Sequence, residues 1–238
     1  MLDIHCHLLP GVDDGADTMD EARIMAKMAW DTGTRGLVVT PHSNVPNGFQ
    51  NPWDTRLAGV LDAFRQAVAT LQIDLLVMAG MEVFASDDVA LKIQAGSVIT
   101  LNASRYILLE FLLGDRPARV NRVLDSVADL GLVPVIAHPE RYRFLQEDLS
   151  LAESWSGKGF LLQVDRGSFL GSFGRGSYHA AHALFSKRLA DVVASDGHSP
   201  YQRVPILSDA YEYISDHYSR HYAESLLRGV PGRIVSNK

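Results

Sequence analysis

The sequence has little cysteine and no long apolar run. One cysteine, Cys6, occurs among 238 residues, so no disulfide can form within the chain. No apolar stretch approaches the roughly 20 residues needed to cross a membrane. The N-terminus carries neither the basic segment nor the apolar core of a secretory signal. These absences predict a cytoplasmic protein with no membrane insertion.

Positive charge is also scarce. The chain has 22 Lys and Arg residues against 28 Asp and Glu residues, for a net charge of −6. Nucleic-acid binders usually carry a basic patch, so this charge predicts no nucleic-acid partner. An anionic substrate stays compatible with it, because bound metal ions would reverse the local field.

Several catalytic motifs are missing as well. Val12 stands six residues after Cys6, so the Cys-x5-Arg loop of cysteine-dependent phosphatases is absent. The sequence also lacks a Gly-x-Ser-x-Gly elbow, a Walker-type loop and a Gly-x-Gly-x-x-Gly fingerprint. These absences disfavour the chemistry that depends on each motif.

Short β-rich segments alternate with helical patterns along the chain. Strands are predicted at Leu2–His5, Leu37–Thr40, Leu75–Met81, Tyr106–Phe111, Val133–Ala137, Phe160–Val164 and Val192–Ser195. Helices are indicated by the capping box Thr18–Glu21 and by apolar spacing over Leu57–Leu71 and Val120–Leu130. The last ~30 residues also have a helical pattern. This alternation, without a linker, predicts one domain over residues 1–238, built as a parallel barrel or a doubly wound sheet.

Histidines and carboxylates follow nearly every predicted strand. They are His5, His7, His42, Glu82, Glu110, His138, Asp196 and His198. Parallel β/α folds build their active sites at the carboxyl ends of the strands. Mixed sets of imidazole and carboxylate ligands suit Zn, Mn and Fe. The set therefore predicts a metal cluster at one edge of the sheet.

Spacing supports this interpretation at both ends of the chain. His5 and His7 lie two apart, so on a strand both point to one face while Cys6 points to the other. Asp196 and His198 have the same spacing. Alone, the first pair could be surface histidines and the second could cap a helix. The occurrence of such residues at so many strand ends favours metal binding.

Other charged residues near these strand ends have two interpretations. Asp13-Asp14-Gly15 is typical of a simple turn, but it could equally fold a carboxylate over the metals. Arg141 could make a surface salt bridge worth under ~1 kcal/mol. Beside a metal cluster, its planar guanidinium would suit a phosphate group, and Arg203 is a weaker candidate for the same task.

The remaining histidines fall in helical stretches. Solvent exposure is expected for His179, His182, His217 and His221. They are therefore placed outside the cluster.

At this point the residues resemble a known family. Met1–Gly15, with its His-x-His and Val-Asp-Asp-Gly, resembles the start of PHP-superfamily (polymerase and histidinol phosphatase) proteins. More narrowly, it is similar to the bacterial manganese-dependent protein-tyrosine phosphatases of capsule and exopolysaccharide operons. The likeness continues through Thr40–His42, Gly80–Glu82, Glu110–Phe111, His138–Tyr142, Gln163 with Ser168 and Gly171, and Ser195–His198. It covers nearly the whole chain.

The resemblance implies a single distorted (β/α)7 barrel, TIM-like and of the PHP type, with two to three divalent transition metal ions. Mn²⁺ is expected first, with Fe or Zn as alternatives. Carried over, one ion takes His5, His7, Glu82 and Asp196, a second takes Glu82, Glu110 and His138, and a third takes Asp14, His42 and His198.

The resemblance also implies a substrate, the phosphotyrosine-rich tail of a bacterial tyrosine autokinase that controls polysaccharide export. Arg141, and less surely Arg203, would hold the phosphate. The ligand set and the lack of a nucleophilic side chain favour hydrolysis by metal-activated hydroxide, without a phosphoenzyme.

Three alternatives remain open. A PHP phosphatase could act on a small ester such as histidinol phosphate, and Ser43 and the unfamiliar stretch Asn44–Trp53 leave substrate choice unsettled. A TatD-like metal nuclease also opens with His-x-His, but Asp196-x-His198 favours the PHP group. A non-enzymatic scaffold of the polysaccharide machinery would leave the ligand set unexplained. The sequence does not indicate an oligomeric state.

Overall fold

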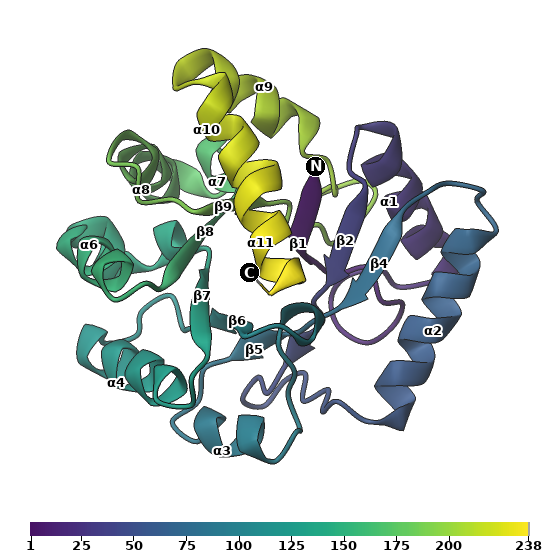
Figure 1. Cartoon of the computed structure of the whole chain (residues 1–238), viewed down its shortest axis with the longest axis horizontal. Coiled ribbons are helices and arrows are strands. Elements are labelled where there is room, and N and C mark those ends of the chain that lie inside the picture. Colours follow the sequence, from purple (N-terminus) through teal and green to yellow (C-terminus); the bar gives the residue numbers. More distant parts are fainter. Residues whose placement is uncertain (238) are drawn as a thin grey trace.

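Residues 1–237 are described by this computed structural model, in which the strands gather at the centre and most helices lie around them (Figure 1). The strands are β1 (Leu2–Cys6), β2 (Gly36–Val39), β3 (His42–Ser43), β4 (Leu76–Ala79), β5 (Glu82–Phe84), β6 (Tyr106–Glu110), β7 (Val133–Ala137), β8 (Leu161–Asp165) and β9 (Val192–Ala194). The α-helices are α1 (Met19–Asp31), α2 (Thr55–Ala69), α3 (Val89–Gln94), α4 (Pro117–Ala128), α5 (Arg143–Glu147), α6 (Ser150–Gly157), α7 (Arg166–Phe169), α8 (Gly174–Ser186), α9 (Ser208–His217), α10 (Arg220–Glu224) and α11 (Val230–Ser236). Two 3-10 helices are η1 (Leu101–Ala103) and η2 (Pro139–Arg141), and a π-helix is η3 (Ser225–Gly229).

Each strand predicted from the sequence is confirmed, but two short strands were not predicted. β3 follows β2 after a break at Thr40-Pro41, and β5 follows β4 after a break at Gly80-Met81. Proline has no N–H to donate to a ladder, so a break at Pro41 is expected on physical grounds. Gly80 lies so close to Val38 that a Cβ there would be 2.6 Å from its Cγ1 atom.

Every strand pairing is parallel. One sheet has the order β1-β2-β4, and the other has the order β3-β5-β6-β7-β8-β9. The segment after β9 returns to β1: the Asp196 N–H donates to the His5 carbonyl at 2.9 Å, and the His7 N–H donates to the Gly197 carbonyl at 2.8 Å. The two sheets together therefore form one curled surface, in which β1 and β9 lie beside each other at their carboxyl ends. This curled surface is called the sheet below.

Apolar side chains pack in two layers. The larger layer lies between the strands and the surrounding helices and includes Leu37, Phe64 and Trp155. The smaller layer lines the inside of the curl and includes Ile4 and Val135, together with Val230, Ile234 and other residues. The latter two belong to α11, which crosses the centre of the view in Figure 1.

Helix α11 lies at the amino-terminal edge of the strands. The side-chain amide of Asn102 donates to the Val235 carbonyl at 2.9 Å, and the Arg105 N–H donates to the Asn237 side chain at 2.9 Å. Arg105 directly precedes β6. The opposite, carboxyl edge is where the polar residues predicted from the sequence gather.

Local signals account for several helix starts. Thr18 caps α1 by accepting from the Glu21 N–H at 3.2 Å, and Asp54 caps α2 by accepting from the Leu57 N–H at 2.9 Å. The helical pattern predicted for the last ~30 residues is confirmed by α9, α10 and α11. Within residues 1–237, no helix has the length and apolarity that a membrane crossing requires.

The break at Gly80 gives a stability prediction. Gly80→Ala places a methyl group 2.6 Å from Val38 Cγ1 and 3.0 Å from Leu101 Cδ2, so it should destabilise the fold by about 1–3 kcal/mol. Gly59→Ala is the matched control, because a Cβ on this α2 glycine would have no neighbour within 4 Å. It should instead stabilise by up to ~1 kcal/mol, the helix propensity difference. Urea unfolding of both variants measures the two effects, and equal stability of both would contradict the packing argument.

Candidate metal centre

The structure brings every ligand residue expected from the sequence to the carboxyl edge of the sheet. The strand breaks contribute directly, because β3 and β5 pair with His42 opposite Glu82. His5 is the penultimate residue of β1, Glu110 ends β6, and His138 follows β7. The strands predicted from the sequence end at Thr40 and Met81, so the pairing of His42 with Glu82 was not predicted.

Glu82 is the centre of this cluster. Its Oε2 atom lies 2.9 Å from His42 Nδ1, 3.3 Å from His5 Nε2 and 3.3 Å from His7 Nε2. Its Oε1 atom lies 2.9 Å from His138 Nε2. One buried carboxylate therefore contacts four imidazoles from three separate segments of the chain.

Two further carboxylates flank Glu82. Asp196 Oδ1 lies 3.4 Å from His5 Nε2, 3.5 Å from His7 Nε2 and 3.4 Å from His198 Nδ1. Glu110 lies on the other side, with its oxygens 3.6 Å from His42 Nδ1 and 3.6 Å from His138 Nε2.

The Asp13-Asp14-Gly15 turn does fold a carboxylate over the cluster. Asp14 Oδ1 lies 3.4 Å from His42 Nε2 and 3.5 Å from His198 Nε2. Gly15 is needed for this approach, because a Cβ on it would lie 2.1 Å from the His7 carbonyl oxygen. Of the two interpretations that the sequence left open, the structure favours the second.

Within each group, the donor atoms are close enough to bind one shared ion. Three groups have one donor atom per residue within 4.8 Å of each other: His7-Asp14-His42-His198, His5-His7-Asp196 and His42-Glu82-Glu110. Ligands about 2.1 Å from one ion lie roughly 3.0–3.4 Å apart, close to the separations seen here. Among the described residues, buried atoms without a hydrogen bond include His42 Nδ1, Glu82 Oε2 and His198 Nε2. The donor set therefore fits divalent transition metal ions.

The electrostatic environment shifts the pKa values of the cluster residues in different directions. Burial alone would lower the pKa of His5, but the Glu82 and Asp196 carboxylates outweigh it and raise the pKa to about 9. Burial, reinforced by the charge of Glu82, raises the pKa of Glu110 to about 7. Burial also lowers the pKa of His138 to about 4, and the nearby Arg141 charge adds to this shift. Metal binding would therefore displace a proton from His5, since a ligating imidazole must be neutral.

Two residues outside the expected ligand set orient the imidazoles. Gln163 Oε1 lies 2.7 Å from His5 Nδ1, and Asp13 Oδ2 lies 2.8 Å from His7 Nδ1. Asp13 Oδ2 also accepts from the His42 N–H at 2.9 Å. Acceptors at Nδ1 leave Nε2 free to face an ion, as is usual around metal-ligating histidines. This role of Asp13 was not predicted from the sequence, although Asp13 stands in the same turn as Asp14.

Backbone conformation at two cluster positions is strained. His138 has a φ of +35° and Asp196 has a φ of +49°. Residues other than glycine rarely adopt this region, and those that do are concentrated at functional sites. The strain places both side chains at the edge of the sheet.

The two arginines expected to bind phosphate meet beside the cluster. Arg141 Nη1 lies 3.4 Å from Asp165 Oδ2 and 3.4 Å from Asp196 Oδ2, and Arg203 also pairs with Asp196 Oδ2. Both guanidiniums pack on one ring, Phe173, at 4.6 Å for Arg141 and 5.6 Å for Arg203. Arg141 and Arg203 therefore lie together, beside Asp196 and Phe173.

Asp165 and Glu140 lie behind Arg141 and are fully buried. The Asp165 N–H donates to Glu140 Oε1 at 3.0 Å, and the Gln163 amide donates to Asp165 Oδ1 at 2.9 Å. These contacts fix the carboxylate that faces Arg141. Neither Asp165 nor Glu140 was assigned a function from the sequence.

Cys6 lies outside this chemistry. It is fully buried, and its Sγ lies 3.4 Å from the Val38 carbonyl oxygen. Burial raises the pKa of the Cys6 thiol, so a thiolate nucleophile is disfavoured.

The histidines placed outside the cluster lie on helices. His179, His217 and His221 are exposed, as expected. Exposure was wrong for His182, which is half-buried, because its Nδ1 contacts the Tyr218 hydroxyl at 2.8 Å and its Nε2 contacts the Phe169 carbonyl at 3.3 Å.

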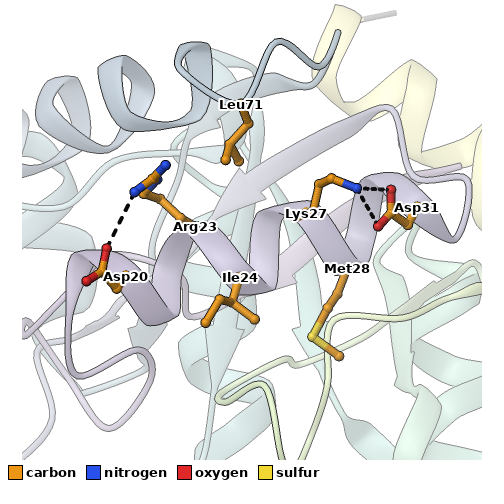
Figure 2. Close-up of a pocket in the computed structure, with 7 residues that line it drawn as sticks. All are labelled: Asp20, Arg23, Ile24, Lys27, Met28, Asp31 and Leu71. Atoms are coloured by element: carbon orange, nitrogen blue, oxygen red, sulfur yellow. Dashed lines mark hydrogen bonds and ion pairs between the residues drawn. The ribbon is translucent and has the colours of Figure 1, made fainter.

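A surface pocket of about 420 Å³ lies along α1 and is separate from the cluster (Figure 2). It is lined by Asp20, Arg23, Ile24, Lys27, Met28, Asp31 and Leu71. Its charged groups pair along the helix, Arg23 with Asp20 at 3.5 Å and Lys27 with Asp31 at 2.6 Å. The pocket therefore offers no converging ligand set.

Comparison with known proteins agrees with this geometry. Tyrosine-protein phosphatase YwqE of Bacillus subtilis is 33% identical over 199 residues, which cover 84% of this chain and 78% of that protein. Tyrosine-protein phosphatase CpsB of Streptococcus pneumoniae is 28% identical over 243 residues, which cover 100% of this chain and 99% of that protein.

Solved structures give the same relationship. A chain from the crystal structures of these two proteins, described there as metal-dependent tyrosine phosphatases, has a TM-score of 0.92 at 29% identity and covers 100% of this chain and 95% of its own. A Listeria monocytogenes protein described as a histidinol phosphatase has a TM-score of 0.54 at 12% identity, covers 90% of this chain and 99% of its own, and shares the fold alone.

The model of one protein family spans almost the entire chain. This family is described as capsular polysaccharide synthesis, CpsB/CapC, and its model matches residues 1–236. The chain therefore belongs to the CpsB/CapC family of capsular polysaccharide synthesis proteins.

Proposed function

We propose that this protein is a metal-dependent protein-tyrosine phosphatase that hydrolyses phosphotyrosine. The proposal rests on one observation: at one edge of the sheet, side chains able to bind metal ions lie beside the guanidiniums of Arg141 and Arg203. Relatives YwqE and CpsB, named as tyrosine-protein phosphatases, support the choice of substrate.

The proposed ligands are those grouped around Glu82. His5, His7, Glu82 and Asp196 would hold one ion, Glu82, Glu110 and His138 a second, and Asp14, His42 and His198 a third. When bound, divalent ions supply Lewis acidity that activates water and offsets phosphate charge. Mn²⁺ is the proposed metal, with Fe or Zn as alternatives, since each accepts mixed histidine and carboxylate ligands.

Arg141 is proposed to bind the phosphate. Burial alone would lower the pKa of this guanidinium, but Asp165 and Asp196 raise it above its ordinary value. Arg141 therefore stays charged and cannot serve as a proton donor. Its planar donors can pair with two phosphate oxygens and stabilise the charge that develops in the transition state. Arg203, which shares the Asp196 contact, is proposed to assist.

Direct hydrolysis fits the leaving group and the side chains present. A tyrosine leaving group has a pKa of about 10, far below that of an alkyl alcohol, so its departure needs little general acid. The buried Cys6 thiol faces away from the cluster, toward the Val38 carbonyl. The reaction is therefore proposed to proceed without a phosphoenzyme.

The wider setting is proposed from the family. The substrate is the phosphotyrosine tail of a bacterial tyrosine autokinase that regulates capsule or exopolysaccharide synthesis, and the enzyme acts in the cytoplasm. The chain is proposed to be a single PHP-type domain. If β2 with β3 and β4 with β5 are each counted as one interrupted strand, seven strands result, which supports the proposal of a distorted (β/α)7 barrel.

Metal removal tests the proposed function. A chelator should abolish hydrolysis of a phosphotyrosyl peptide, and added Mn²⁺ should restore it. Elemental analysis should find two to three equivalents of metal, and His5→Ala and Glu82→Ala should lose both metal and turnover. His221→Ala, an exposed residue of α10, is the control and should keep both. Full activity in metal-free protein would refute the proposal, and faster turnover of histidinol phosphate than of the peptide would redirect it to a small ester.

Replacement of Arg141 separates phosphate binding from metal binding. Arg141→Ala should keep its metal but lower kcat/KM by roughly 10²–10³-fold, the usual loss for one preorganised charged donor. Arg141→Lys should recover only part of this, because a lysine cannot make the two-pronged contact. Steady-state kinetics with metal content measured for each variant is the test. Turnover of Arg141→Ala close to that of the wild type would exclude Arg141 from phosphate binding.

A further inference from the structure

An exposed aromatic ring lies directly against the cluster. Phe49 is 38% exposed, and its ring is nearly parallel to the imidazole of His42, with 5° between the planes and 6.1 Å between the centroids. His42 in turn contacts Glu82 on one side and Asp14 on the other. Phe49 is therefore the apolar surface next to these donor atoms.

A tight loop holds Phe49 in this place. The Asn44 N–H donates to the Gln50 carbonyl at 3.0 Å, and the Val45 N–H donates to the Phe49 carbonyl at 2.9 Å. The Asn44 side chain is buried and donates to the Phe84 carbonyl at 2.7 Å, which ties the loop to β5. The exposed ring is thus carried by a backbone with fixed contacts.

The end of the loop is fixed as well. Asn51 is buried, and its side-chain amide donates to the Val12 and His42 carbonyls, both at 2.8 Å. The Ser43 hydroxyl donates to the Gln50 carbonyl at 3.1 Å and to the Asn51 carbonyl at 3.0 Å. These bonds link the loop to the turn before Asp13 and to β3. Hydrogen bonds, rather than burial of the ring itself, keep Phe49 beside His42.

The proposed substrate has an aromatic group at the matching distance from its phosphate. In phosphotyrosine one ester oxygen joins the phosphorus to the ring, so a phosphate bound at the donor atoms brings the ring just outside them. Aromatic pairs add about 0.5–1.5 kcal/mol beyond the burial of their area. An alkyl phosphate would make no such contact.

We propose that Phe49 is a specificity-determining residue whose exposed ring packs against the aryl group of phosphotyrosine. This inference rests on the proposed function. It gives a function to one residue of the stretch Asn44–Trp53, whose role the sequence left open.

Competitive inhibition by two non-hydrolysable phosphonates tests the contact. Benzylphosphonate reproduces the ring and spacing of an aryl phosphate, whereas ethylphosphonate presents the same charged group on an alkyl chain. With Mn²⁺-loaded enzyme and a phosphotyrosyl peptide as substrate, Phe49→Ala should weaken benzylphosphonate inhibition roughly tenfold, the size expected for losing one aromatic contact and its buried area. Inhibition by ethylphosphonate should change less than about twofold, and manganese content should not change.

Two control variants accompany this measurement. Phe49→Tyr keeps a ring and should retain the preference for benzylphosphonate. Leu76→Ala removes a side chain that is 59% exposed at the start of β4, on the opposite edge of the sheet, and should alter neither inhibitor. The pair distinguishes loss of the ring from loss of any exposed apolar group.

Three results would overturn the inference: equal weakening of both inhibitors, loss of manganese, or no change in either inhibitor. The first two would mean that Phe49 acts only by supporting His42. Failure of wild-type enzyme to hydrolyse the phosphotyrosyl peptide would instead refute the proposed function. The wild-type rate and the inhibitor ratio therefore report separately on the two proposals.

Discussion

A buried carboxylate, Glu82, lies between four imidazoles, and the arrangement of the carboxyl edge depends on it. Its two oxygens lie 2.9–3.3 Å from His5, His7, His42 and His138. A charge taken out of water is costly unless it is paired, so this site must be filled by protons or by metal ions. Binding of ions at Glu82 would thus couple to the folding of distant segments.

The curl of the sheet supplies the geometry that this carboxylate needs. The breaks at Pro41 and Gly80 let β3 and β5 pair with His42 beside Glu82, and the segment after β9 returns to β1. Strain at His138 and Asp196 is tolerated because hydrogen bonds and packing fix the backbone on both sides. The strands that carry His5, His42, Glu82 and Glu110 hold these side chains more rigidly than loops would.

Residue type and local spacing predicted much of this site. His5 and His7 share a face because a strand alternates, and the edge of a parallel sheet gathers the residues that follow each strand. The sequence did not predict β3 and β5 themselves. The close approach of Gly80 to Val38 joins two different strands, and no local pattern shows it.

Contacts between distant parts of the chain account for the other differences. The bond of Asp13 to His42, twenty-nine residues away, identifies Asp13 as an orienting residue, and no local pattern shows it. His182, on α8, is half-buried because it contacts Tyr218, which directly follows α9. The position of Phe49 likewise depends on bonds from Asn44 to Phe84 and from Asn51 to Val12.

The central claim is that the residues around Glu82 hold catalytic metal ions. Anomalous diffraction from crystals of the wild-type protein grown with Mn²⁺ tests it most directly. The account predicts two to three anomalous peaks at this edge of the sheet, each about 2.0–2.4 Å from donor atoms of the groups around Glu82, Asp14 and Asp196. Peaks only at surface carboxylates, with no anomalous signal beside Glu82, would contradict it.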